Sequence, residues 1–420
     1  MTGKTATVSI PPYQHNQNKT IMLNIEDPRT VKPFGLLNLG FRPFFLAAGL
    51  FAVISMLLWF ALYILHQPLL PTALPAMLWH GHEMVFGYSL AVIAGFLLTA
   101  IKNWTGQQTL HGRGLLLLAL LWLAARILPF LPFATALYWM AVADQLFMIV
   151  LISAMLQPIV KVRQWKHLAI ILKIALLFLS NGLFYLGIFN VLPTETIQWG
   201  LLSGVYLVIS LIMLMGRRVI PFFIEKGVDE DAVMKNWKWL DISSIFLFLV
   251  FTVLIVFFHY PLVNSILAGI LFVLHAIRLW GWHTRGIWHK PLLWVLYLGY
   301  GFIVLGFALQ ALTHWLGPSP WLALHAFAAG GIGIITMGMM CRVALGHTGR
   351  NVFAPPKVVG VIFALLVLAA IVRVILPILL PDLYLWWIGI TQLLWVIGFL
   401  LFVVVYAPML IKARVDGRPG

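Results

Sequence analysis

Histidine is the residue type whose number and placement in this sequence suggest chemistry. The 420 residues include 13 histidines, although only 9% of the residues are charged and 62% are hydrophobic. A polar side chain inside a long apolar segment is costly and usually functional, whereas a histidine at the end of such a segment suits a membrane–water interface. We expect the interfacial role for the following residues: His66, His111, His167, His283, His289 and His314.

Three histidines lie inside apolar segments in a pattern that suits a haem. His80 and His82 open one segment, and His325 lies in another among alanines and glycines. Axial ligation of a haem iron requires two neutral imidazoles, here from two helices. The small residues around His325 would let a flat macrocycle approach the backbone, or they would serve close helix packing, which also selects small residues in membranes.

The choice between His80 and His82 stays open at this point. The two residues are about 200° apart on an ideal helix and cannot serve one site. Glu83 shares the face of His80, so it could orient an imidazole or neutralise a metal. Its alternative role is an ion pair with a buried arginine, Arg126 or Arg373.

A weak internal repeat connects the two histidine-bearing segments. A shift of 243 residues, the separation of His82 from His325, also superposes glycines and a Thr-Gly pair: Gly87 on Gly330, Gly95 on Gly338, and Thr105-Gly106 on Thr348-Gly349. Both segments therefore run from a histidine to a similar turn. This register pairs His82, and not His80, with His325.

The elements that position these residues are about twelve transmembrane helices. Apolar runs long enough to cross a hydrocarbon core of roughly 30 Å occur throughout the chain, and the absence of strand-like alternation predicts an all-α bundle and not a barrel. The expected spans are 42–66, 78–101, 114–132, 136–157, 167–191, 197–215, 240–259, 262–280, 291–314, 321–341, 357–380 and 384–409.

Lysine and arginine predict the orientation of the bundle. They gather before the first span and in every second loop, while the loops 67–77, 192–196, 315–320 and 381–383 have none. Because positive loops stay in the cytoplasm, we expect both termini there, in a bacterial inner membrane. The net charge of +15 is thus a topology signal that fits the lipid bilayer and its anionic surface, and no nucleic-acid partner is expected.

The chain divides into one membrane domain and two short tails. We expect a polar cytoplasmic N-terminal tail at 1–33, which includes His15, a single transmembrane helical domain at 34–412, and a short C-terminal tail at 413–420.

Two strings carry a family resemblance. The run from Trp79 to Met84, with Asn103-Trp104-Thr105-Gly106, and the run from Arg342 to Arg350 resemble the NnrS family, and the resemblance extends from Phe41 to the last helix. It implies an inner-membrane protein that holds haem, of b type, and copper, and that is linked to nitric oxide tolerance.

A remoter resemblance concerns the catalytic subunit of haem–copper oxidases and nitric oxide reductases. Its helix 2 pattern matches His80-Gly81, Met84 and Phe86, and its helix 10 pattern matches His325 with Gly331. This resemblance favours His80 as the partner of His325 and an oxidase-like helix arrangement. The position of the second helix 10 histidine is Ala323, and only His259 resembles a copper ligand, which argues against an oxidase-type binuclear centre.

The segment from Arg342 to Arg350 forms a second candidate site, on the cytoplasmic face. It carries His347 between two arginines near a Gly-rich turn, which suits a carboxylate clamp, a metal site or a lipid headgroup contact. Arg217 and Arg218, expected in the loop after the sixth span, could join it. His275, at a similar depth, could pair with His347 in a second haem or copper site: these two residues complete the candidate metal ligands.

Three functions follow as hypotheses. The first is a haem protein that binds, senses or reduces nitric oxide or a related species. The second is a secondary transporter for a metal chelate or an anion, in which the Gly330–Gly333 run would break a helix. The parallel repeat mildly disfavours it. The third is a structural role in which the buried histidines are idle.

Overall fold

The protein is an α-helical bundle with twelve helices long and apolar enough to cross a membrane in the described part of the chain. The computed structural model describes residues 34–70, 74–229 and 231–418, so the expected tail at 1–33 lies outside the described residues. In the order of the chain, the candidate spans are Phe41–Tyr63, Ala76–Thr105, Gly112–Phe130, Ala136–Lys161, Trp165–Ile188, Glu195–Gly227, Lys238–Phe257, Pro261–Gly281, Pro291–Leu316, Pro320–His347, Val358–Leu379 and Pro381–Ile411.

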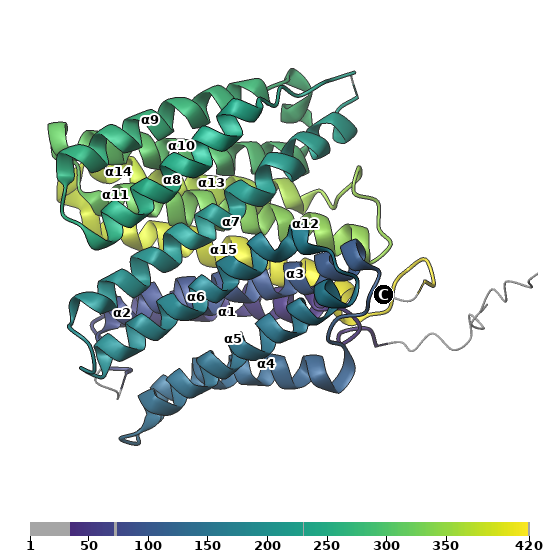
Figure 1. The fold of residues 1–420 in the computed structure, drawn as a ribbon, viewed down its shortest axis with the longest axis horizontal. Helices are drawn as coiled ribbons and strands as arrows, with labels where there is room; N and C mark the ends of the chain where they lie inside the picture. Colours follow the sequence, from purple (N-terminus) through teal and green to yellow (C-terminus); the bar gives the residue numbers. More distant parts are fainter. Residues whose placement is uncertain (1–33, 71–73, 230, 419–420) are drawn as a thin grey trace, which may run out of the picture.

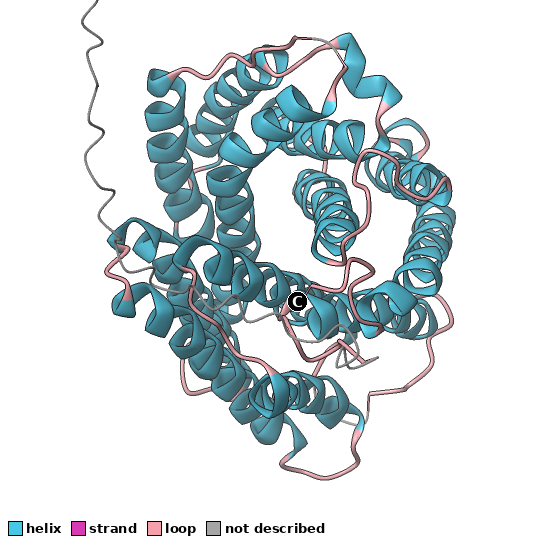
Figure 2. Ribbon diagram, turned by 90° about the vertical axis from the view of Figure 1, so that its right-hand side faces the viewer, coloured by secondary structure: helices cyan, strands magenta, loops and turns pink. Residues whose placement is uncertain are grey.

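The spans are built from helices that lie roughly side by side (Figure 1). Figure 2 looks along them. The first half contains α1 (Phe41–Tyr63), α2 (Ala76–His82), α3 (Leu90–Thr105), α4 (Gly112–Ile127), α5 (Ala136–Lys161), α6 (Leu168–Ile188) and α7 (Glu195–Gly227). The second half contains α8 (Lys238–Phe257), α9 (Pro261–Gly281), α10 (Pro291–Leu316), α11 (Pro320–His325), α12 (Ile334–His347), α13 (Val358–Val374), α14 (Leu376–Leu379) and α15 (Tyr384–Ile411).

The expected all-α fold and the number of spans are confirmed for the described residues. They hold no β-strand, and the one isolated bridge joins Phe34 to Lys412. This bridge brings the two ends of the described chain together, as an even number of crossings requires. Which side of the membrane they face stays a prediction.

The largest error in a predicted boundary is at the end of the sixth span; the tenth span also ends later than predicted, at His347 and not 341. The sixth span was expected to end at 215, but α7 continues through Arg217, Arg218 and Pro221 to Gly227. Arg217 is held in the helix by an ion pair of 2.8 Å with Asp241 of α8. Hydropathy falls where a helix leaves the bilayer, although the helix itself need not end there.

Two π-helices follow the histidines of the second and tenth spans. η2 (Glu83–Ser89) joins α2 to α3, and η6 (Ala326–Gly333) joins α11 to α12. A shift of 243 residues superposes their first residues, and the left-handed glycines Gly106 and Gly349 also correspond. The weak sequence repeat is therefore reproduced in the backbone. A π-helix still satisfies its backbone hydrogen bonds, so the tenth span is continuous and not broken at its glycines.

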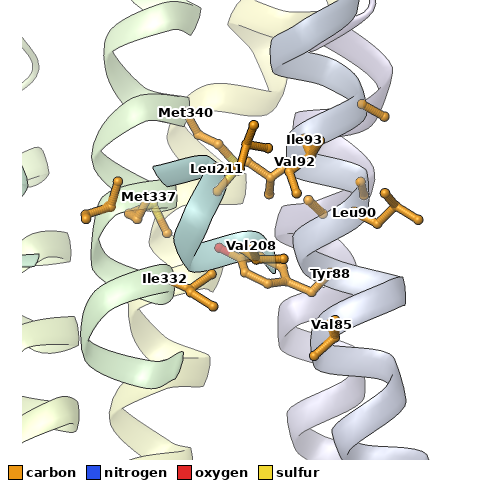
Figure 3. Close-up of a cluster of buried hydrophobic side chains, with 14 of the residues drawn as sticks. Val85, Tyr88, Leu90, Val92, Ile93, Val208, Leu211, Ile332, Met337 and Met340 are labelled. Carbon is orange, nitrogen blue, oxygen red and sulfur yellow. The ribbon is translucent and has the colours of Figure 1, made fainter. Parts of the chain in front are cut away.

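The two π-helical spans meet at the core of the bundle. Figure 3 shows Tyr88 and Val85 on one side, Ile332 and Met337 on the other, and Val208 of α7 between them. The Tyr88 hydroxyl lies 2.7 Å from the Thr336 hydroxyl. Because π-helices are frequent at functional sites, the histidines just before them are candidates for a functional site.

Candidate functional site

His325 is oriented by the backbone of its own helix. Its Nδ1 lies 2.7 Å from the Trp321 carbonyl oxygen, so this nitrogen carries the proton and donates it. The unprotonated Nε2 then faces Arg373 of α13, whose guanidinium nitrogen is 3.2 Å away. A carbonyl bond at Nδ1 is also what fixes the ring of a metal-ligating imidazole, and here Nε2 accepts the hydrogen bond from Arg373.

His80 lies in the same region as His325. The two imidazoles are electrostatic neighbours, and Arg373 acts on both of them. The ring of His80 stacks on Trp59 of α1, with 4.4 Å between centroids and 8° between planes. Its Nδ1 is buried and has no hydrogen-bond partner among the described residues. This orphaned nitrogen is available to a ligand.

His82 points to a different place, a buried ion cluster between α2, α4, α5 and α6. Its two ring nitrogens lie 3.1 Å from a Glu83 carboxylate oxygen and 2.9 Å from Asn181 Oδ1. Arg126 bridges the two acids of the cluster, at 2.8 Å from Glu83 and 2.5 Å from Asp144. The structure therefore places His80, and not His82, within electrostatic reach of His325, and it gives Glu83 an ion pair with Arg126.

The comparisons with known proteins assign the chain to a family. The family described as NnrS protein matches residues 35–414, nearly the whole chain. The chain belongs to the NnrS family. No curated protein matches this NnrS chain. The family membership confirms the resemblance that was seen in the strings around His80 and His347.

The glycines near His325 serve helix packing in this NnrS protein. A Cβ on Gly330 would lie 2.4 Å from the Phe302 ring, one on Gly331 would lie 2.7 Å from the Ile303 side chain, and one on Gly333 would lie 2.7 Å from Trp395. These positions are filled by protein side chains, so the macrocycle that the sequence suggested has no room against them. The packing interpretation of the glycines is the one that the structure supports.

The other predicted histidines are separate from this site and from one another. His275 of α9 is buried, with its Nδ1 2.7 Å from the Tyr300 hydroxyl and its Nε2 unpartnered. His347 lies beside Asn103 and Phe41 instead, so the structure does not pair it with His275. His259 is exposed in the turn between α8 and α9.

The two arginines of the segment from Arg342 to Arg350 also lie in different surroundings. Arg342 lies over the Phe223 ring of α7, with 3.7 Å to the centroid. Arg350 lies past the end of α12, where burial lowers the pKa of its guanidinium. Nearby, Arg414 donates to the His347 carbonyl and to Asp416, and its hydrogen bonds hold the pKa of Asp416 well below its usual range.

The side-chain donors of this site fit a haem and a copper ion to different degrees. Nε2 of His325, once it releases the Arg373 hydrogen bond, and the orphaned Nδ1 of His80 are the imidazole nitrogens that would hold a haem iron. For copper, the described residues contain no group of three or more His, Cys, Asp or Glu side chains that could hold a metal ion. The donors present thus fit the haem, and no copper ligand set is assigned.

Sequence reasoning missed several residues that build these two sites. Asp144 completes the ion cluster, and Tyr384 and Trp59 line the site of His80 and His325. Asp144 gave a clear signal, because an acid in the middle of an apolar span is costly and usually has a specific partner. The two aromatic residues gave none, since aromatic residues are common at membrane interfaces.

Proposed function

We propose that this NnrS protein is a haem protein of the bacterial inner membrane that acts in the response to nitric oxide, with His80 and His325 as the axial ligands. The observation that carries the proposal is the orientation of His325, whose Nδ1 is bound to the Trp321 carbonyl while the unprotonated Nε2 accepts a hydrogen bond from Arg373. The family membership supplies the link to nitric oxide.

The protein residues around the two imidazoles have definite roles in this proposal. Trp321 fixes the tautomer and the ring orientation of His325, and Trp59 holds the ring of His80 by stacking. The haem, when bound, would supply one-electron chemistry at its iron. Arg373 places a positive charge near both imidazoles, and this charge would favour the reduced form of a bound haem over the oxidised form.

The test is a reduced-minus-oxidised optical spectrum with pyridine-haem quantitation on the detergent-purified chain. We expect a low-spin haem in the wild type that is lost in His80→Ala and in His325→Ala. His259→Ala, a change in an exposed turn, is the matched control and should retain the haem.

Two results would overturn the assignment. Retention of the low-spin spectrum in both ligand variants would place the haem elsewhere. A wild type without stoichiometric haem, after expression with haem supplied, would remove the redox function, and the transporter hypothesis would then be the one to test.

A further inference from the structure

The buried arginines of the membrane domain differ in one respect, the presence of an oxygen partner. Four arginines are buried among the described residues: Arg42, Arg126, Arg278 and Arg373. Arg42 donates to the Leu410 and Lys412 carbonyls, Arg126 pairs with two carboxylates, and Arg278 pairs with Asp241. Within the described part of the chain, Arg373 has neither a carboxylate nor a carbonyl within hydrogen-bonding distance.

The partners that Arg373 does have leave its charge uncompensated. One guanidinium nitrogen reaches His325 and, at 3.4 Å, the Tyr384 hydroxyl. The other terminal nitrogen is buried without a hydrogen-bond partner. The residue is 8% exposed, and a buried charge without a counter-charge is strongly unfavourable. A ligand that brings negative charge would remove this penalty.

The internal repeat shows what a completed site of this type contains. His82 and His325 are equivalent in the repeat, and the span after each of them carries a buried arginine, Arg126 or Arg373. In the register of the repeat Arg126 falls on Ala369, one helical turn before Arg373. Around Arg126, the charge is balanced by Glu83 and Asp144. In the register of the repeat, the residue that corresponds to Glu83 is Ala326. The second half of the chain therefore has an arginine one helical turn from the equivalent position and lacks the carboxylate.

We propose that Arg373 binds a planar anion with two terminal oxygens, of the carboxylate or nitrite class, in the place that Glu83 and Asp144 occupy around Arg126. The planar guanidinium presents two parallel N–H groups that match a two-oxygen anion. The Tyr384 hydroxyl, which accepts a bond from Arg373, keeps its proton free to donate to the same anion. The proposal rests on the proposed function only for one source of the anion, a carboxylate of the haem. The other source is a free small anion.

The experiment has two arms, each run on the full-length protein in detergent with wild type, Arg373→Gln and Arg373→Lys. The first arm compares the affinity of haem with that of its dimethyl ester, in which the carboxylates are masked and the iron is unchanged. The second arm follows the thermal unfolding midpoint with added nitrite against chloride at equal ionic strength, on haem-free protein. Arg350→Gln, which removes an arginine outside the spans, is the control.

Either of two results supports the proposal. If the anion is a haem carboxylate, the wild type binds haem about tenfold or more tightly than the ester, the factor expected from a charge-assisted hydrogen bond, and Arg373→Gln binds both equally. If it is a free anion, nitrite raises the unfolding midpoint of wild type and not of Arg373→Gln. Arg373→Lys, which keeps the charge without the planar fork, should be intermediate in the responsive arm.

The proposal is overturned if wild type and both Arg373 variants, shown to be folded by circular dichroism and size exclusion, agree in the ester ratio and in the nitrite response. A wild type that binds neither haem nor ester refutes the haem function alone, because the nitrite arm is read without haem.

Discussion

Two buried arginines in this protein have opposite electrostatic surroundings, although they occupy related places in the two halves of the chain. Arg126 neutralises Glu83 and Asp144, all three almost fully buried, so its removal leaves two carboxylates in a low-dielectric interior. Arg373 neutralises no acid among the described residues, and its removal takes away a charge that is costly to bury. The same substitution should therefore have different effects at the two positions.

We expect Arg126→Gln to destabilise the protein by about 3–5 kcal/mol, the usual effect of breaking a buried ion pair. Arg373→Gln should leave the stability of the ligand-free protein unchanged or raise it. The measurement is unfolding of the detergent-solubilised protein, monitored by circular dichroism for both variants and wild type. Equal loss of stability in the two variants would contradict this account of the ion cluster.

At the residue scale, the sequence predicted which side chains matter better than which of them meet. His80, His82 and His325 were all identified, and so were Arg126 and Arg373 as possible partners of Glu83. The pairing was ambiguous because a difference of two positions along a helix changes the face, while the neighbour on each face is set by packing between helices. The packing of α2 places His80 on the side of Trp59 and His82 on the side of Asp144, and the sequence does not show this.

At the element scale, the spans followed from hydropathy, but the π-helices did not. A π-helix adds one residue to a turn, and this insertion leaves composition and hydropathy unchanged. The sequence allows three interpretations of the run from Gly330 to Gly333: a cradle for a macrocycle, a break in the helix, or close helix packing. The structure supports the packing, because α10 lies directly against the run through Phe302 and Ile303. Glycine here permits close approach of two helices.

A pair of glycine substitutions tests this packing. In Gly330→Ala the new methyl group would lie 2.4 Å from the Phe302 ring and 2.6 Å from its Cβ, too close to be relieved by rotating the ring. We expect a loss of about 1–3 kcal/mol in the free energy of unfolding. Gly81→Ala is the matched control, since its methyl group would meet Leu201 at 3.5 Å, an ordinary contact. It should be neutral or slightly stabilising, as alanine favours a helix.

The readout is again unfolding in detergent, with haem content measured in parallel. If Gly330→Ala were as stable as Gly81→Ala, the close contact between η6 and α10 would be wrong, and the glycines would again be candidates for ligand contact.

At the scale of the whole molecule, the charge pattern and the fold constrain each other. The bridge between Phe34 and Lys412 places both ends of the described chain on one side, and the distribution of lysine and arginine predicts that this side is the cytoplasm. The fold alone does not show which side of the membrane the two ends face, because helix packing is the same in either orientation. Only the charges of the loops carry the information.

The single cysteine makes this orientation directly measurable. Cys341 is buried, so it should not react with a membrane-impermeant maleimide, and new cysteines can be introduced without background. Ser319→Cys, in the exposed loop before α11, and Lys166→Cys, exposed in the short 3-10 helix η4 (Trp165–His167) before α6, lie on opposite sides. In intact cells we expect labelling of Ser319→Cys alone, and labelling of Lys166→Cys only after the membrane is permeabilised. The reverse pattern would place His80 and His325, both near the same end of the bundle as Ser319, on the cytoplasmic side. A ligand for Arg373 would then have to arrive from the cytoplasm.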